Sequence, residues 1–193
     1  MMDFEAYSRQ LYDALRTVDP AALNAATALL ETAYDQDKAV YAAGNGQSAS
    51  TADAFALDLY KQTVGRYDIR RFRAISLASN VAALTAWAND RDYEAIFTEQ
   101  LRTYLQAGDV FVAFSASGNS PNMVQAAEWV RANGGYTVAL TGFSGGCLRE
   151  VAHACVHVAV SDYGHAETAH VAIMHYWVDY FKEKLARLAQ TSD

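Results

Sequence analysis

The spacing of apolar residues predicts helices over most of the first 35 residues. Between residues 3 and 35, leucines and alanines recur at intervals of three and four, as on the buried side of an amphipathic helix. Asp19 precedes Pro20, which is the arrangement of an N-cap followed by proline at the first helical position. We therefore expect a helical N-terminal region with a break near Asp19.

Short apolar runs alternate with helical patterns along the rest of the chain. Strands are expected at 39–43, 72–78, 110–114, 136–140 and 155–160. Helices are expected at 48–63, 80–106, 121–133 and 166–188. Strands separated by helices of this length favour a parallel sheet that is covered on both faces and joined by right-handed crossovers. The predicted fold is a three-layer α/β sandwich, with residues 1–193 as a single domain.

Composition and charge narrow the classes of function. The chain has 193 residues, of which 52% are hydrophobic and 19% charged, as is typical of a globular domain with a buried core. Its net charge of −7 argues against binding to a nucleic-acid backbone, which requires a basic surface. The sequence contains no signal-peptide pattern and no run of roughly 18 apolar residues that would cross a bilayer. We expect a cytoplasmic protein with neither nucleic-acid nor membrane partners.

Two loops of small residues follow predicted strands and directly precede predicted helices. They are Gly44-Asn45-Gly46-Gln47-Ser48 and Ser115-Ala116-Ser117-Gly118-Asn119-Ser120. Open α/β sheets bind ligands beyond the carboxyl ends of their strands, and helix N-termini attract anions through unpaired N–H groups and the helix dipole. The second loop has three serines and no positive charge, which suits a phosphate monoester. Neither loop has the glycine pattern of a dinucleotide site or a P-loop, and the alternative is a polar turn with an ordinary helix cap.

The last predicted helix carries a cluster of carboxylate and imidazole groups. His165, Glu167, His170 and His175 lie within eleven residues. Glu167 shares a helical face with His170, three residues away, and with His175, a little over two turns away. Such groups serve as acid and base or as metal ligands, and the alternative is a solvated polar face. Asp58, which lies among apolar neighbours after the first loop, is either a surface charge or a residue directed into the site.

Two further motifs complete a recognisable set. Ala88-Asn89-Asp90 and Leu140-Thr141-Gly142-Phe143-Ser144-Gly145-Gly146 stand in order with the two loops. In this combination the sequence resembles the sedoheptulose-7-phosphate (phosphoheptose) isomerases of the sugar-isomerase (SIS) superfamily over almost its whole length. The resemblance implies a five-stranded parallel sheet, a homotetramer with active sites where subunits meet, and N-terminal helices (residues 3–35) that pack in the oligomer.

The resemblance also implies roles for the residues at matching positions. The residues expected to hold the phosphate are Ser115, Ala116, Ser117 and Ser120. The residues expected to contact the sugar are Asn45, Gly46, Gln47, Ser48, Asn89 and Asp90. Asp58 matches the catalytic carboxylate and His175 the catalytic histidine, while Glu167 replaces a glutamine that contacts substrate and metal. Asp58, Glu167 and His175 are the implied ligands of a divalent metal, zinc, with His165 or His170 as further candidates.

Three departures from the family pattern bear on activity. Ala54 replaces a metal-binding histidine, Asp58 is shorter than the usual glutamate, and Gln47 replaces a glycine. The expected reaction is the isomerisation of D-sedoheptulose 7-phosphate to D-glycero-D-manno-heptose 7-phosphate through an enediol, with Asp58 or Glu167 making one proton transfer and His175 the other. Two alternatives stay open. One is a non-catalytic phosphosugar-binding or adaptor protein of the kind that associates with the replication initiator, and the other is an isomerase of another phosphorylated sugar.

Overall fold

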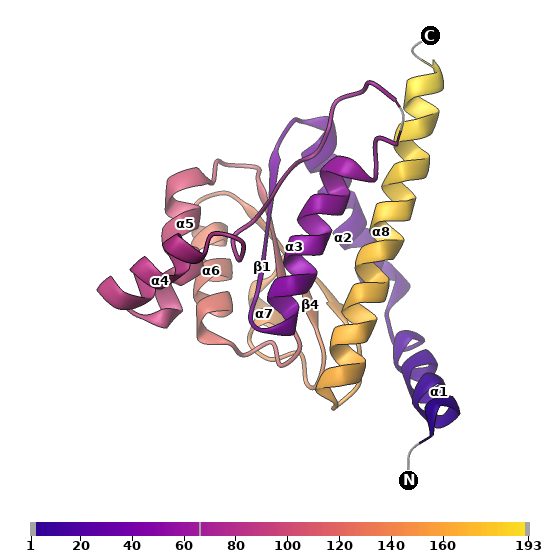
Figure 1. The fold of residues 1–193 in the computed structure, drawn as a ribbon, viewed down its shortest axis with the longest axis horizontal. Coiled ribbons are helices and arrows are strands. Elements are labelled where there is room, and N and C mark those ends of the chain that lie inside the picture. The colour runs from indigo at the N-terminus through magenta and orange to yellow at the C-terminus, as the bar shows by residue number, and fades with distance from the viewer. Residues whose placement is uncertain (1–2, 66, 192–193) are drawn as a thin grey trace.

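Five parallel strands form a sheet with helices on both faces (Figure 1). The structure is a computed structural model that describes residues 3–65 and 67–191. The strands are β1 (Ala39–Gly44), β2 (Arg73–Ser76), β3 (Val110–Ser115), β4 (Tyr136–Thr141) and β5 (Ala154–His157). Their spatial order is β2-β1-β3-β4-β5, and every neighbouring pair is parallel. The predicted fold class and the five-stranded sheet are therefore confirmed.

The helices agree with the sequence pattern over most of the chain. They are α1 (Phe4–Leu15), α2 (Pro20–Asp35), α3 (Gln47–Lys61), α4 (Val81–Asp90), α5 (Ile96–Tyr104), α6 (Pro121–Ala132), α7 (Leu148–Val151) and α8 (Tyr163–Thr191), with a 3-10 turn, η1 (Tyr93–Ala95). The helix predicted over 80–106 is interrupted because the Asp92 side chain accepts a hydrogen bond from the Ala95 amide and starts a new turn. The sequence also did not predict α7, and the last strand ends at His157 rather than 160. The break at Asp19 is confirmed, with its carboxylate accepting a hydrogen bond from the Ala21 amide.

Alternate residues of each central strand belong to two separate cores, one on each face of the sheet. In β1, Val40 and Ala42 pack in the core formed with α2, α3 and α8, whereas Tyr41 and Ala43 pack in the core formed with α5 and α6. All six residues of β1 and of β3 are buried, as expected for strands covered on both sides. Trp177 of α8 is fully buried in the first core. This burial holds α8 beside the sheet.

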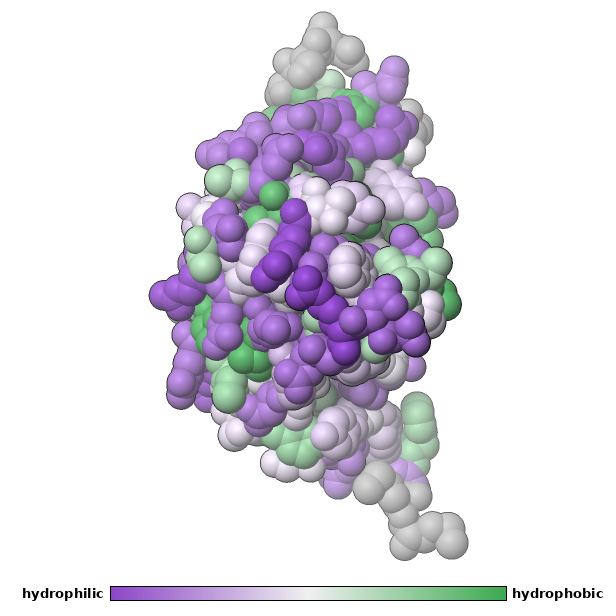
Figure 2. Space-filling view, turned by 90° about the vertical axis from the view of Figure 1, so that its left-hand side faces the viewer, coloured by the Kyte–Doolittle hydropathy of each residue, from purple (hydrophilic) through white to green (hydrophobic). Residues whose placement is uncertain are grey.

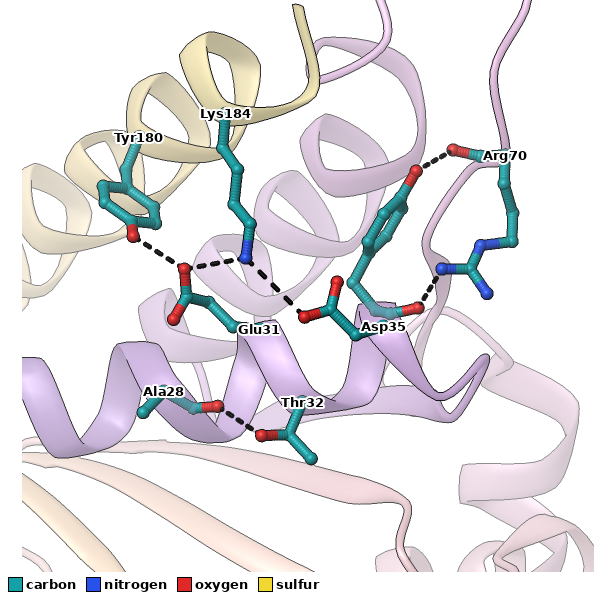
Figure 3. A network of polar contacts seen from close by, with 8 residues as sticks. Ala28, Glu31, Thr32, Asp35, Arg70, Tyr180 and Lys184 are labelled. Carbon is teal, nitrogen blue, oxygen red and sulfur yellow. Dashed lines mark hydrogen bonds and ion pairs between the residues drawn. The ribbon is translucent and has the colours of Figure 1, made fainter. Parts of the chain in front are cut away.

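Polar contacts also fix the rotation of α8 against α2 (Figure 3). The Tyr180 hydroxyl and Lys184 Nζ both donate to Glu31 Oε1, at 2.7 and 2.8 Å, and Lys184 Nζ lies 3.8 Å from Asp35 Oδ2. In addition, Trp177 Nε1 donates a hydrogen bond to a threonine of α2 at 3.0 Å. Ion pairs that are partly exposed stabilise weakly. The main consequence of these contacts is for the orientation of α8, because they help to determine which side of the helix faces the sheet.

The N-terminal helices pack on elements of the same chain. Leu30 of α2 and Ala14 of α1 are buried in the core that α8 shares. The Tyr7 ring of α1 lies 4.5 Å from the ring of His165, near the start of α8. The implied packing of these helices in an oligomer stays a prediction.

The molecular surface is polar over the side that carries α4 and α5. Hydrophilic side chains cover most of this side, and apolar side chains occur there in small separate groups (Figure 2). Across residues 3–65 and 67–191, no helix has both the length and the apolar character needed to cross a membrane.

Candidate active site

The order of the strands places the two predicted loops next to each other. β1 and β3 are neighbours in the sheet, yet the chain leaves β1 for β2 on one side and later enters β3 on the other. In open α/β sheets, the crevice beyond the carboxyl ends of the strands at such a reversal is the usual ligand site. Gly44 pairs with Phe114 in the β1–β3 register, so the two loops begin side by side.

One cavity of about 130 Å³ brings both loops together with the start of α8. Its lining residues are Asn45, Ser48, Phe114, Ser115, Ala116, Ser117, Ser120, Tyr163 and Glu167. Every one of these except Phe114 and Tyr163 belongs to the predicted substrate-binding set. The lining contains no lysine or arginine, so any anion here is held by hydroxyl and main-chain donors.

Unpaired polar groups are concentrated at the start of α6. Ser120 is the N-cap residue of α6, but its hydroxyl makes no capping hydrogen bond. Pro121 has no N–H, and the Met123 and Val124 amides donate to the Ser120 carbonyl oxygen at 3.0 Å, so in the described structure Asn122 carries the first-turn N–H that is left for a ligand. In the part of the chain that the structure describes, Ser115 Oγ is buried and has no hydrogen-bond partner. A bound anion at this helix N-terminus would satisfy both deficits, because buried polar groups are normally hydrogen-bonded.

Glycine residues hold the 115–120 loop rigidly against the loop that follows β4. Gly118 has a φ of +67°, and a Cβ atom there would lie 1.9 Å from the carbonyl oxygen of Gly145. Gly146 has a φ of +55°, and a Cβ atom there would lie 2.5 Å from the Gly118 carbonyl carbon. The Cys147 amide donates a hydrogen bond to Asn119 Oδ1 at 2.9 Å. The 115–120 loop is thus held in its conformation by contacts within the protein.

Asn45 is held by a pair of hydrogen bonds that sequence reasoning did not identify. Asn45 Nδ2 donates to Asn122 Oδ1, and Asn122 Nδ2 donates to Asn45 Oδ1, both at 2.9 Å. The Tyr93 hydroxyl also donates to Asn45 Oδ1, at 3.0 Å. Asn122 lies in the first turn of α6 and is only 1% exposed. The sequence signal was a polar amide directly after Pro121, on the buried side of an otherwise alanine-rich helix.

Two residues of α8, Glu167 and His170, lie in different environments. Glu167 lines the cavity, and burial together with the negative charge of Asp162 raises the pKa of its carboxyl. His170 is buried, and neither of its ring nitrogens has a hydrogen-bond partner among the described residues. The pKa of His170 is lowered to about 4, mainly by burial and to a smaller extent by the nearby His157, while the Thr141 backbone acts in the opposite direction. His170 is therefore neutral near pH 7 and takes no part in the cavity lining.

His165 belongs to a different cavity. Its Nδ1 lies 2.7 Å from Asp162 Oδ1, and both residues line a cavity of about 460 Å³ against α1, together with Gln10 and Asp13. Neither of the two predicted loops borders this larger cavity. Its size therefore does not make it the better candidate for the predicted chemistry.

Six residues of the predicted site lie outside the 130 Å³ cavity. They are Gly46, Gln47, Asp58, Asn89, Asp90 and His175. Asn89 Nδ2 donates to Asp90 Oδ1 at 2.9 Å, and both residues are exposed at the end of α4. Asp58 is half-buried on α3, which packs beside α8 (Figure 1). His175 is exposed and lies eight residues beyond Glu167, about 12 Å along the helix.

The predicted zinc ligands do not come together in one chain. Within residues 3–65 and 67–191, no group of three histidine, cysteine, aspartate or glutamate side chains is close enough to hold a metal ion. Glu167 and His175 are separated by eight residues along α8, and Ala54 supplies no ligand atom on α3. The residues of a single chain therefore do not fit zinc.

Comparison with known proteins identifies the family. The chain matches the SIS domain family over residues 3–142. It is 35% identical to the phosphoheptose isomerase of Citrifermentans bemidjiense over 166 residues, which cover 85% of this chain and 84% of that protein. It is 40% identical to the phosphoheptose isomerase of Akkermansia muciniphila over 134 residues, which cover 68% and 69% of the two chains. The structure of phosphoheptose isomerase GmhA from Neisseria gonorrhoeae has a TM-score of 0.84 at 26% identity and covers 92% of this chain and 94% of that one. The chain therefore belongs to the SIS domain family and, within it, to the phosphoheptose isomerase family.

Proposed function

We propose that this protein is a ketose–aldose isomerase that converts D-sedoheptulose 7-phosphate to D-glycero-D-manno-heptose 7-phosphate. The observation that carries the proposal is the single cavity in which the two small-residue loops meet the Glu167 carboxyl. Relatives named phosphoheptose isomerase, 35–40% identical to this chain, support the choice of substrate. The reaction moves one proton between adjacent carbons, so the site must hold a phosphate and place an acid–base group near those carbons.

The phosphate end of the substrate is assigned to the 115–120 loop. Ser115, Ser117 and Ser120 supply hydroxyl groups, and Ala116 and Asn122 supply main-chain N–H groups. A volume of about 130 Å³ is smaller than the roughly 300–1,000 Å³ of common small-molecule pockets. We therefore assign the cavity to the phosphate and the nearest carbons, with the rest of the sugar extending past Asn45 and Ser48.

Glu167 is the acid–base group that this chain places in the cavity. Its raised pKa brings the carboxyl closer to the operating pH, where general acid–base catalysis is most efficient. As a carboxylate it removes the proton on the carbon next to the carbonyl, and the resulting carboxylic acid returns a proton to the neighbouring carbon of the enediol. The second transfer, between the two oxygens, is assigned to His175, with Asp58 as the second carboxylate.

His175 and Asp58 lie outside the cavity of a single chain, so another subunit is needed to bring such groups to the substrate. The family resemblance implies active sites where subunits meet, and we propose that a homotetramer completes the site in this way. Zinc stays a prediction from the resemblance alone, and no proton transfer is assigned to it because the residues of one chain do not gather around a metal. A cytoplasmic location likewise stays a prediction.

A non-catalytic role is the second candidate. Ala54 in place of a metal-binding histidine, and the lack of any three-residue metal cluster among the described residues, favour a protein that binds a phosphosugar without transforming it. Such a protein has no use for a carboxyl with a raised pKa inside the cavity, and Glu167 is the feature that weighs against it. An isomerase of another phosphorylated sugar would use the same phosphate loop and the same Glu167 carboxyl.

The test is to incubate the protein with sedoheptulose 7-phosphate in D₂O and to follow aldose formation by NMR. Isomerisation through an enediol exchanges one carbon-bound proton with solvent, so deuterium should appear next to the carbonyl. Glu167→Gln keeps the shape of the side chain and removes its basicity, and the rate should fall by about 10²–10⁴-fold. A panel of other ketose phosphates separates a different substrate from a lack of activity.

A matched control uses a glutamate outside the site. Glu183→Gln changes an exposed residue on the same helix and should leave the rate unchanged. Binding of sedoheptulose 7-phosphate without turnover, with and without added divalent metal, would contradict the isomerase and support the binding protein.

A further inference from the structure

We propose that Asn122 and Tyr93 are positioning residues that orient Asn45 toward the sugar part of the substrate. This inference rests on the proposed function, because it concerns how the same cavity recognises a sugar phosphate. Neither Asn122 nor Tyr93 belongs to the substrate-binding set implied by the family motifs. Both act through Asn45, and neither lines the cavity.

The hydrogen-bonding capacity of Asn45 is almost completely used within the protein. A side-chain amide has two N–H donors and one oxygen with two lone pairs. Asn45 Oδ1 accepts from Asn122 Nδ2 and from the Tyr93 hydroxyl, and Asn45 Nδ2 donates to Asn122 Oδ1. One N–H of Asn45 is left over. Since Asn45 lines the cavity beside Ser48, that N–H is the group available to a substrate oxygen.

The contacts also hold the Asn45 amide in place. If the Asn45 side chain alone rotated by 180°, its NH₂ group would face the NH₂ group of Asn122, and its oxygen would face the Asn122 oxygen. Asn122 is buried, so water does not compensate for that mismatch. The two amides therefore keep one mutual orientation, and the pair fixes the position of the Asn45 amide that the sugar meets.

The three residues come from three segments that surround the cavity. Asn45 follows β1, Asn122 lies in the first turn of α6 beside the phosphate loop, and Tyr93 lies in η1, three residues after Asp90. One amide pair thus sets the spacing between the predicted sugar loop and the predicted phosphate loop. Tyr93 links the segment that carries Asn89 and Asp90 to the same point.

The experiment compares two ligands, inorganic phosphate and sedoheptulose 7-phosphate, by calorimetric titration of the intact protein. Asn122→Leu removes both amide contacts without adding charge near the phosphate loop. We expect the dissociation constant for sedoheptulose 7-phosphate to rise about tenfold, as for the loss of one oriented hydrogen bond, with the value for inorganic phosphate within twofold. Tyr93→Phe removes a single contact from an exposed residue and should produce a smaller rise in the same direction.

A double substitution separates positioning from general structural support. If Asn122 acts through Asn45, adding Asn122→Leu to Asn45→Ala should weaken sugar-phosphate binding no further than Asn45→Ala alone. Asn133→Leu is the matched control, because it removes an amide hydrogen bond at the opposite end of α6 and should leave both affinities unchanged.

Several outcomes would overturn the inference. They are an equal loss of affinity for both ligands in Asn122→Leu, additive effects in the double variant, or a wild-type protein that binds the two ligands equally well. The wild-type protein could also bind sedoheptulose 7-phosphate more tightly than phosphate without isomerising it. That result would contradict the proposed function alone, because the affinities of the variants would still test the role of Asn122 and Tyr93.

Discussion

The two halves of the predicted site differ in how completely one chain assembles them. The phosphate half, formed by the loops at 44–48 and 115–120, converges on one cavity. The acid–base half does not converge. Glu167 lines the cavity, whereas His170 is buried, with no hydrogen-bond partner for its ring nitrogens among the described residues, and His175 is exposed farther along α8.

Geometry explains this difference. Two loops that follow adjacent parallel strands must start at the same edge of the sheet, so topology alone brings them together. Residues spread along a helix turn about its axis by 100° at each step and rise by 1.5 Å, so a cluster in the sequence is dispersed in space. The phosphate half is therefore a property of the sheet, and the acid–base half depends on what packs against each side of α8.

The largest effect is expected from a change at His175. His175→Ala should lower the isomerisation rate by about 10²–10⁴-fold, because an imidazole that shuttles protons at oxygen is lost. Calorimetry should show binding of sedoheptulose 7-phosphate within about twofold of wild type, because His175 does not line the cavity. A rate close to wild type would remove His175 from the mechanism and leave Glu167 as the acid–base group supported by the structure.

A second test uses the pH dependence of stability and concerns His170. Its pKa is about 4 in the folded state and about 6.5 unfolded, so the unfolded state binds more protons between these values. The contribution of His170 to the free energy of unfolding is therefore fully present above pH 6.5. It falls by about 3 kcal/mol as pH decreases to 4. Chemical denaturation at a series of pH values should show this loss for wild type and a smaller one for His170→Leu.

The control for His170 lies on the same helix. His175→Gln replaces an exposed histidine and should reproduce the wild-type pH profile of stability. The difference between wild type and His170→Leu also includes the interaction of His170 with His157, whose pKa burial also lowers. An unchanged profile in His170→Leu would show that His170 is not a neutral buried group.

The rigidity of the phosphate half is tested at Gly118. Gly118→Ala places a methyl group against the Gly145 carbonyl in a left-handed backbone conformation, and we expect a loss of about 2–4 kcal/mol in the free energy of unfolding. Gly134→Ala shares the positive φ but meets its nearest neighbour, Ala107 Cβ, only at 3.3 Å, and should lose about 1 kcal/mol. Equal losses in urea titrations would mean that the contact between Gly118 and the loop after β4 contributes nothing to stability.

The smallest expected effect sharpens the assignment of the phosphate. Ser115→Ala removes a buried hydroxyl that has no partner in the described structure, so stability should stay the same or rise while phosphate affinity falls about tenfold. Thr137→Val removes another buried hydroxyl without a described partner, at the other end of the sheet, and should leave phosphate affinity unchanged. Unaltered phosphate binding by Ser115→Ala would place the anion elsewhere.

Much of the fold followed from local patterns. The apolar runs ending in glycine or serine predicted β1 and β3 within one residue, and Asp19 before Pro20 predicted the boundary between α1 and α2. Where a single side chain competed with the helix, as Asp92 does, periodicity alone failed. The short helix α7 and the early end of β5 were missed because neither has enough residues to show a period.

By itself, the sequence determined the five strands, most of the helices and the two small-residue loops that follow β1 and β3, because these depend on neighbours a few residues apart. Tertiary structure alone decided that Asn45 pairs with Asn122, that His165 and Glu167 line different cavities, and that Asp58 and His175 lie outside the cavity of one chain. Contacts between residues tens of positions apart, and the rotation of a helix about its axis, are set by packing against the sheet. Local sequence does not record that packing.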